Sequence, residues 1–268
     1  MPILAKSMIN KMANSAVLLV THVVDKRIIE KYKVLSHDLN PRMYDVVLMV
    51  NADLPPQFET HGEIKCFYNS CDKVNSLGYN PLTDRLLPGS THFPLLHFFR
   101  KNPNYRHYWF IEYDVEFTGN WNVLMGDCDG NLAGYDFLSC HVARFGEDNK
   151  EWPWWHRGNN CGYPLTKCVK GFNPICRYSN RALACLDKHQ RDGYSAHSEV
   201  MITSCLYNNG MRIGDMGGTG EFTPQGYRNK YYVQGVGIHN GTMRWRPPYT
   251  MEEIVALGTK DKLFHPIK

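Results

Sequence analysis

The sequence predicts an α/β protein in which a central mixed, mainly parallel twisted sheet is flanked by helices. Short apolar runs of strand length alternate with segments of helical pattern, and the connections between them are short in the first half of the chain. This alternation is the pattern of parallel strands joined by right-handed crossovers. No linker, repeat or low-complexity stretch divides the 268 residues, so we expect one domain over residues 1–268.

The first half supplies most of the expected sheet. Apolar, β-branched runs predict buried strands, and segments with helical periodicity lie between them. The expected strands are residues 15–24, 44–50, 64–68 and 108–111, and the expected helices are residues 26–39 and 93–100.

The second half is less regular. Residues 135–142 predict a further strand, and helices are expected over 180–189 and 198–209, the second ending before Gly210. The polar, Trp-rich stretch 143–163 predicts a long loop, and loops of that length commonly bind ligands or cover sites. After Gly210 the sequence becomes Gly-rich and irregular.

Two carboxylates follow the apolar run that ends at Ile111. Glu112 and Asp114 are two residues apart, so in an extended segment both side chains point to the same side. The carboxyl edge of an α/β sheet is where such sheets bind ligands. One or two carboxylates that leave room for phosphate oxygens suit Mg²⁺. The alternative is that both are solvated turn residues, or partners of nearby Lys and Arg.

Composition narrows the classes of function. A net charge of +4 without a dense run of Lys or Arg argues against a nucleic-acid partner. The nine cysteines form no CxxC pair and are odd in number, so we expect reduced thiols in a cytoplasmic protein. The apolar run 16–20 is too short for a membrane span, which leaves only peripheral membrane contact.

These residues resemble a known superfamily, the glycosyltransferases of the GT-A fold. The acidic motif Glu112-Tyr113-Asp114 is similar to their DxD motif, with Glu at the first position, and Ser198-Glu199-Val200 resembles their acceptor-side helix start. Residues 109–119, with the pattern W-x-x-E-Y-D-V-x-x-x-G, and residues 264–268 are similar to a poorly characterised group within it. The resemblance implies a Rossmann-like domain with a nucleotide-sugar half, about 15–125, and an acceptor half, about 126–268.

The resemblance also implies an activity and a metal. The expected reaction moves a sugar from a nucleoside-diphosphate sugar to a saccharide or glycoconjugate acceptor, in polysaccharide or glycan synthesis. Mn²⁺ or Mg²⁺ would be the cofactor, and a UDP-sugar the first choice of donor before a GDP-sugar. Asp114 is the implied direct metal ligand and Glu112 a ribose or metal-water contact. His265 and His239 are candidates to complete the metal shell, although a lone His is more often a satisfied polar residue.

Glu199 is the implied general base, which an inverting transferase needs near the acceptor hydroxyl. Its alternative role is that of a first-turn helix acid favoured by the macrodipole, with Ser198 as the cap. Asp215 is the second candidate for the base.

Aromatic and polar residues suggest the remaining contacts. The cluster Trp152, Trp154, Trp155, His156 and Arg157 predicts an acceptor platform, because Trp faces stack on sugar rings; a small satellite core is the alternative. By their position after the first two strands, four residues are expected to contact the base and ribose of the nucleotide: Thr21, His22, Asn51 and Asp53. Tyr113 of the acidic motif is expected there as well.

Two other classes of protein compete with this interpretation. A sugar-phosphate nucleotidyltransferase shares the nucleotide-binding half, but its Gly-rich, Lys-containing phosphate loop is missing after the first expected strand. A non-catalytic carbohydrate-binding protein would need the Trp cluster alone and leaves Glu112, Asp114 and Glu199 unexplained.

Overall fold

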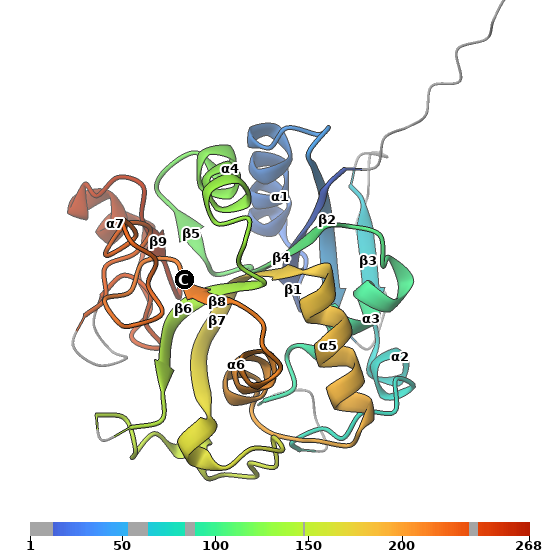
Figure 1. Cartoon of the computed structure of the whole chain (residues 1–268). Coiled ribbons are helices and arrows are strands. Elements are labelled where there is room, and N and C mark those ends of the chain that lie inside the picture. Colours follow the sequence, from blue (N-terminus) through green and yellow to red (C-terminus); the bar gives the residue numbers. More distant parts are fainter. Residues whose placement is uncertain (1–12, 53–63, 84–88, 147, 236–240) are drawn as a thin grey trace, which may run out of the picture.

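A seven-stranded mixed sheet forms the centre of the molecule (Figure 1). The computed structural model describes residues 13–52, 64–83, 89–146, 148–235 and 241–268. The strand order is β3-β2-β1-β4-β7-β6-β8, in which only β7 runs antiparallel to its neighbours. The predicted fold class is therefore confirmed. The strands are β1 (Ser15–Thr21), β2 (Tyr44–Asn51), β3 (Cys66–Asn69), β4 (His107–Glu112), β6 (Phe137–Arg144), β7 (Val169–Ser179) and β8 (Ile213–Asp215).

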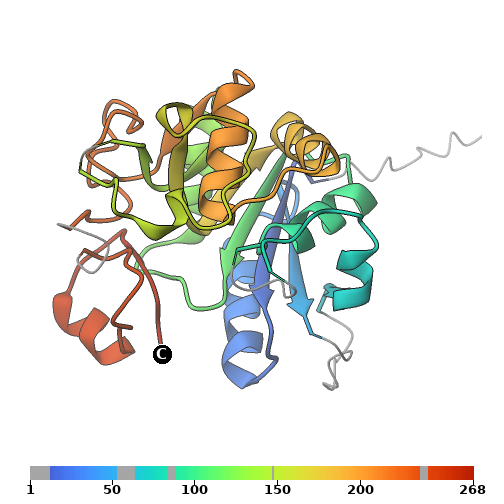
Figure 2. The same ribbon diagram turned by 90° about the horizontal axis from the view of Figure 1, so that it is seen from below.

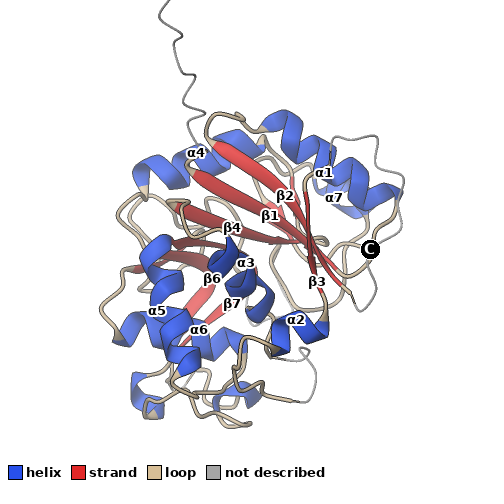
Figure 3. Ribbon diagram, turned by 90° about the vertical axis from the view of Figure 1, so that its right-hand side faces the viewer, coloured by secondary structure: helices blue, strands red, loops and turns tan. Residues whose placement is uncertain are grey.

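Helices cover both faces of this sheet, as Figures 1 and 3 show. One face packs against α1 (Lys26–Asp38) and α4 (Trp121–Asn131). The opposite face packs against α2 (Cys71–Asn75), α3 (Phe93–Lys101), α5 (Asn180–Arg191) and α6 (Ser198–Asn208). Among the described residues, no helix is both long and apolar enough to cross a membrane.

Strand β1 shows why these residues form a central strand. All seven of its residues are buried, and successive side chains enter opposite layers. Leu18 and Val20 belong to the core under α3, α5 and α6, whereas Val17 and Leu19 belong to the core under α1 and α4. A strand that is apolar on both faces is stable only between two covered layers.

Strand β7 was not predicted from the sequence, although it lies near the middle of the sheet. Gly171 and Pro174 interrupt its apolar pattern, and proline in a strand interior normally argues against a central strand. The structure accommodates them because the β6–β7 register shifts on either side of Cys140, which leaves Pro174 outside the paired positions.

Several element boundaries also differ from the expectation. Strand β1 ends at Thr21 rather than at Val24, and β3 and β6 each begin two residues later than predicted. Helix α4 was missed because Gly126 and Gly130 weaken its helical pattern. Short elements that were also missed are α2, β5 (Glu116–Phe117), β8, α7 (Met251–Leu257) and β9 (Leu263–Phe264).

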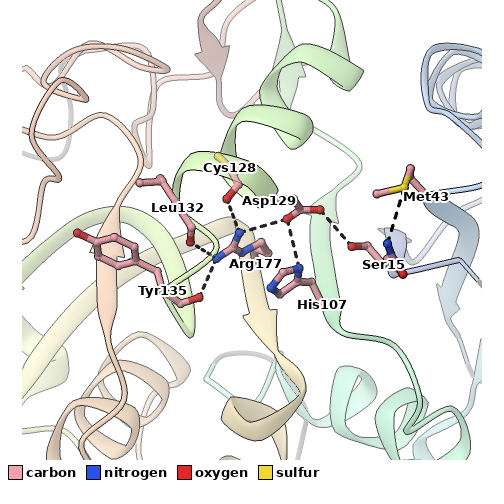
Figure 4. A network of polar contacts seen from close by, with 9 residues as sticks. Ser15, Met43, His107, Cys128, Asp129, Leu132, Tyr135 and Arg177 are labelled. Atoms are coloured by element: carbon pink, nitrogen blue, oxygen red, sulfur yellow. Dashed lines mark hydrogen bonds and ion pairs between the residues drawn. The ribbon is translucent and has the colours of Figure 1, made fainter.

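A buried polar network ties α4 to the sheet (Figure 4). The Arg177 side chain of β7 is fully buried and lies 3.1 Å from Asp129 Oδ1. Asp129 also accepts a 3.1 Å hydrogen bond from Ser15 and lies 3.5 Å from His107 Nδ1. The guanidinium donates further to three backbone carbonyls at the end of α4 and just beyond it: Cys128, Leu132 and Tyr135.

The C-terminal segment returns to the carboxyl end of β4. Its strand β9 pairs with β5 in a two-stranded sheet, and α7 packs beside β9 (Figure 2). The backbone N–H of Ile267 donates a 2.9 Å hydrogen bond to the carbonyl of Asp114. This contact fixes residues 263–267 beside the acidic turn that follows β4.

Candidate functional site

Three potential metal ligands converge where β4 ends. Glu112 is its last residue, Asp114 lies in the turn that follows, and His265 comes from the C-terminal segment. One ligand atom from each lies within 4.8 Å of the others. His265 Nε2 is 3.7 Å from Glu112 Oε2 and 3.6 Å from Asp114 Oδ1. The fold thus brings together three of the residues that the sequence predicted as metal ligands: Glu112, Asp114 and His265.

The tautomer of His265 suits a metal ligand. Its Nδ1 lies 2.8 Å from the carbonyl oxygen of Arg244. Because a carbonyl only accepts, Nδ1 must carry a proton. In the neutral imidazole the lone pair is therefore on Nε2, the atom nearer the carboxylates. Such an outer hydrogen bond commonly orients metal-binding histidines. The Phe172 ring packs edge-on against the imidazole, with ring centroids 5.2 Å apart.

Asp114 retains a buried acceptor without a partner. Its Oδ1 is buried and accepts no hydrogen bond. The nearest lysine, Lys31, instead donates to the carbonyl of Val115 and lies 3.2 Å from Glu116. An unsatisfied buried carboxylate oxygen costs free energy in the absence of a cation. Oxygen and imidazole donors in this arrangement fit Mn²⁺ or Mg²⁺.

The charge of this cluster affects His265. Burial acts to lower its pKa, but the hydrogen bond and charge of Glu112, with the charge of Asp114, outweigh burial and raise the pKa above 6.5. Without a metal, the imidazolium is therefore the cation that this site favours.

Glu199 lies at the start of α6, close enough to the same cluster for the charges of Glu112 and His265 to act on its carboxyl group. Its side chain is only 19% exposed. Burial raises its pKa to about 8, the Glu112 charge adds to that effect, and the charges of Lys170 and His265 oppose it. The N-cap of α6 is His197, whose Nδ1 accepts a 3.4 Å hydrogen bond from the Glu199 N–H, so the expectation of Ser198 as the cap was wrong.

Two of the predicted platform tryptophans contact His197, the residue before Ser198 and Glu199. The Trp154 ring stacks on His197 with centroids 4.1 Å apart at 16°. The Trp152 ring lies 4.8 Å from the Lys170 ammonium and meets the His197 ring edge-on. Both indoles are partly exposed, so each keeps an accessible surface beside α6.

Trp155 does not fit the predicted platform. It is fully buried, it packs against Phe145, and its indole N–H donates a 2.9 Å hydrogen bond to the carbonyl of Asn149. Trp155 belongs to the main core on the α3, α5 and α6 face of the sheet, so it is neither a ligand face nor part of a separate satellite core. His156 and Arg157 are exposed beyond it.

Asp215 is unsuited to the role of general base. It is 2% exposed, and it accepts hydrogen bonds from the Tyr232 hydroxyl. Three backbone N–H groups, those of Val142, Gly217 and Gly218, also donate to it. A carboxylate whose two oxygens are both engaged this way holds a loop in place and has no open position for an acceptor hydroxyl.

The residues expected at the nucleotide vary in availability. Thr21 uses its hydroxyl within its own turn, where it accepts from the Val23 N–H at 3.1 Å. Asn51 accepts a 3.0 Å hydrogen bond from Asn69. His22 is exposed and meets the Tyr113 ring edge-on at 5.3 Å. Asp53 and His239 lie outside the described residues.

Two residues near the site were missed from the sequence. His197 directly precedes Ser198 and Glu199, so its position just before the expected helix could have marked it as a candidate neighbour of Glu199. Lys170 lies in the unpredicted strand β7, and nothing in its local sequence singles it out.

Comparison with known proteins gives fold-level similarity only. No family model matches the chain, and no curated protein matches it. Among solved structures, mouse xyloside xylosyltransferase 1 in its apo form is 10% identical with a TM-score of 0.39, covering 76% of this chain and 85% of that one. Core-mannan synthase A from Aspergillus fumigatus, in an Mn/GDP form, is 13% identical with a TM-score of 0.36, covering 76% and 72%.

A third similar structure is glucosyl-3-phosphoglycerate synthase from Mycobacterium tuberculosis, in complex with Mn²⁺, UDP-glucose and phosphoglyceric acid. It is 13% identical with a TM-score of 0.37, covering 78% of this chain and 84% of that one. At such identities and scores, the function has to be argued from the residues of this site.

Proposed function

We propose that this protein is a metal-dependent glycosyltransferase that moves a sugar from a nucleoside-diphosphate sugar to a saccharide or glycoconjugate acceptor. The observation that carries the proposal is the convergence of Glu112, Asp114 and His265 at the carboxyl end of β4, close to Glu199. Ligands commonly bind at this edge of an α/β sheet.

Glu112, Asp114 and His265 would hold Mn²⁺ or Mg²⁺. The ion, when bound, would supply Lewis-acid stabilisation of the negative charge that develops on the departing diphosphate. The donor would lie over residues 15–125, with His22 and Tyr113 at the nucleotide and Thr21, Asn51 and Asp53 nearby. A UDP-sugar is our first choice and a GDP-sugar the second.

Glu199 would accept the proton of the attacking acceptor hydroxyl. A general base works best when its pKa lies near the operating pH, and burial places that of Glu199 at about 8. Neutralising the Glu112 charge would remove one of the effects that raise this pKa, so a loaded metal site would favour the deprotonated base.

The acceptor would lie over residues 126–268, against the partly exposed faces of Trp152 and Trp154. Aromatic faces bind the apolar sides of sugar rings, and Lys170 and His197 provide polar neighbours. A role in glycan or polysaccharide synthesis follows from this class of acceptor.

Hydrolysis of nucleotide sugars tests the proposal. The purified protein is incubated with UDP- and GDP-sugars, with and without Mn²⁺, and release of the nucleoside diphosphate is measured. We expect slow Mn²⁺-dependent release for one donor, its loss in Asp114→Asn, and its retention in the exposed control Glu30→Gln. Pyrophosphate release from a nucleoside triphosphate and a sugar phosphate would instead indicate a nucleotidyltransferase. Sugar binding without either reaction would indicate a carbohydrate-binding protein.

A further inference from the structure

Four of the nine cysteines lie close to one another in the second half of the chain. Cys161 and Cys168 bracket a short loop, and their Sγ atoms are 3.6 Å apart. Cys185 of α5 and Cys205 of α6 lie on two helices that pack against each other, and each thiol shifts the pKa of the other. All four are unbonded thiols in the structure.

Both pairs surround a single aromatic side chain, Tyr163. Its ring stacks on His189 of α5 with centroids 5.6 Å apart, and its hydroxyl accepts a 2.8 Å hydrogen bond from Asn209 at the end of α6. His189 Nε2 also lies 2.9 Å from the carbonyl of Cys161. The loop, α5 and α6 therefore form one packed unit, in which Cys161 and Cys168 lie at the two ends of the loop and Cys185 and Cys205 lie on the two helices.

We infer that Cys161–Cys168 and Cys185–Cys205 form two disulfides when the chain folds in the presence of an oxidant. A disulfide needs sulfur atoms about 2.05 Å apart. The 3.6 Å contact therefore has to shorten by a displacement that a surface loop allows. The Cys161 and Cys168 sulfur atoms are already in contact, and Cys185 and Cys205 lie on neighbouring helices whose packing would allow the second bond. This inference concerns covalent structure and does not depend on the proposed function.

The chemistry needs an oxidant, and a disulfide donor such as oxidised glutathione or a protein disulfide would serve. The Cys168 thiolate attacks one sulfur of the donor and releases a thiolate, which leaves a mixed disulfide. Cys161 then attacks Cys168 Sγ, which forms the Cys161–Cys168 bond and releases the second thiol of the donor. Two electrons and two protons pass to the oxidant.

The state of the thiols supports this order of attack. The hydrogen bond from Cys161 lowers the pKa of Cys168 to about 7, and the hydrogen bond from Cys205 lowers that of Cys185 to about 7. Thiolates, not thiols, carry out exchange. Cys161 and Cys168 are buried in the finished fold, so the oxidant would have to reach Cys168 after the loop has brought the two thiols together and before the loop packs against α5 and α6.

The inference replaces the expectation of reduced cysteines. An odd total argued against a complete disulfide framework, but it does not exclude two bonds among nine cysteines. The other five are Cys66, Cys71, Cys128, Cys140 and Cys176.

Peptide mapping tests the pairing directly. The chain is secreted from eukaryotic cells, purified as a monomer without reductant, alkylated in denaturant and digested with trypsin. Trypsin cleaves after Lys167, so a Cys161–Cys168 bond would link the peptides 158–167 and 168–170. A Cys185–Cys205 bond would link the peptides 182–188 and 192–212. Alkylation of all nine cysteines, or links between other pairs, would overturn the inference.

Thermal unfolding provides a second readout. Reductant should lower the Tm of the secreted protein by roughly 5–10 °C, because two loop constraints are lost. A variant with serine at positions 161, 168, 185 and 205 should have the lower Tm and show no response to reductant. The matched control Cys66→Ser removes an exposed thiol and should keep the full response. A wild-type Tm that ignores reductant would contradict the inference, and neither readout involves sugar transfer.

Discussion

The structure holds two clusters of carboxylate and histidine at opposite ends of β4, and only one of them contains an arginine. At the start of the strand, His107 and Asp129 meet the buried guanidinium of Arg177 (Figure 4). At its end, His265 lies beside Glu112 and Asp114, the described ligand set includes no Arg or Lys, and Asp114 Oδ1 accepts no hydrogen bond. We call the first cluster completed, because Arg177 neutralises its carboxylate, and the second incomplete, because a carboxylate oxygen in it accepts no hydrogen bond. A completed cluster is typical of a structural role, whereas an incomplete one indicates a site for a ligand.

The largest effect should come from the incomplete cluster. Asp114→Asn removes a negative ligand, so we expect nucleotide-sugar turnover to fall by about 10³-fold or more. The free energy of unfolding should change little, since Asp114 Oδ1 accepts no hydrogen bond in the fold. Turnover and chemical denaturation measure the two quantities. The control is Asp148→Asn, an exposed carboxylate of the loop after β6. An active but unstable Asp114→Asn protein would reverse the comparison.

The completed cluster should respond in the opposite way. Arg177→Met leaves Asp129 buried without its cation and removes the donors to three carbonyls at the end of α4. We expect a loss of about 3–5 kcal/mol in the free energy of unfolding, measured by denaturant titration. Folded Arg177→Met protein should still bind Mn²⁺. Unchanged stability would show that this network is not structural.

The substitution Glu199→Gln should change activity and the free energy of unfolding in opposite directions. Its pKa in the fold, about 8, lies above the ordinary value of 4.5, so the folded state holds a proton that the unfolded state releases. Its contribution to stability is therefore lost as pH rises through this window. Glu199→Gln should raise the free energy of unfolding at pH 9 by up to about 4 kcal/mol while activity falls 10²–10⁴-fold. Equal stability of both proteins between pH 5 and pH 9 would contradict the raised pKa.

The smallest effect should be metal stabilisation and its pH dependence. Mn²⁺ at 100 times its Kd should add about 2.7 kcal/mol to the stability of the native state. Because His265 must be neutral to bind and its pKa is raised, Mn²⁺ affinity should fall as pH drops through that pKa. Calorimetry at several pH values measures this, with His156→Ala, an exposed histidine, as the control for His265→Ala. Equal affinity in both variants would remove His265 from the site.

The sequence was most informative where local pattern and fold agree. The strands β1, β2 and β4 are continuous apolar runs, and their shared carboxyl edge placed Glu112 and Asp114 correctly. Strand β7 could not be predicted because Gly171 and Pro174 are tolerated only through the β6–β7 register shifts, which are tertiary. Helix α7 was predictable, since Thr250 and Glu253 form a capping box and Gly258 ends it.

The site was predicted in part for the same reason. A tryptophan pattern cannot distinguish a ligand face from a buried ring, and Trp155 differs from Trp154 only in what surrounds it. Likewise, Asp215 is a carboxylate beside a Gly-rich loop in sequence, and only the folded chain brings Tyr232 and the backbone donors to it.

The attachment of the C-terminal segment to the acidic turn has a consequence for biosynthesis. Glu112 and Asp114 are translated long before His265, and the hydrogen bond from Ile267 to Asp114 closes the arrangement last. A ribosome must therefore pass residue 265 before a nascent chain can present the complete ligand set. An ion captured earlier would meet carboxylates alone, so the proposed metal site would stay incomplete until residue 265 has been made.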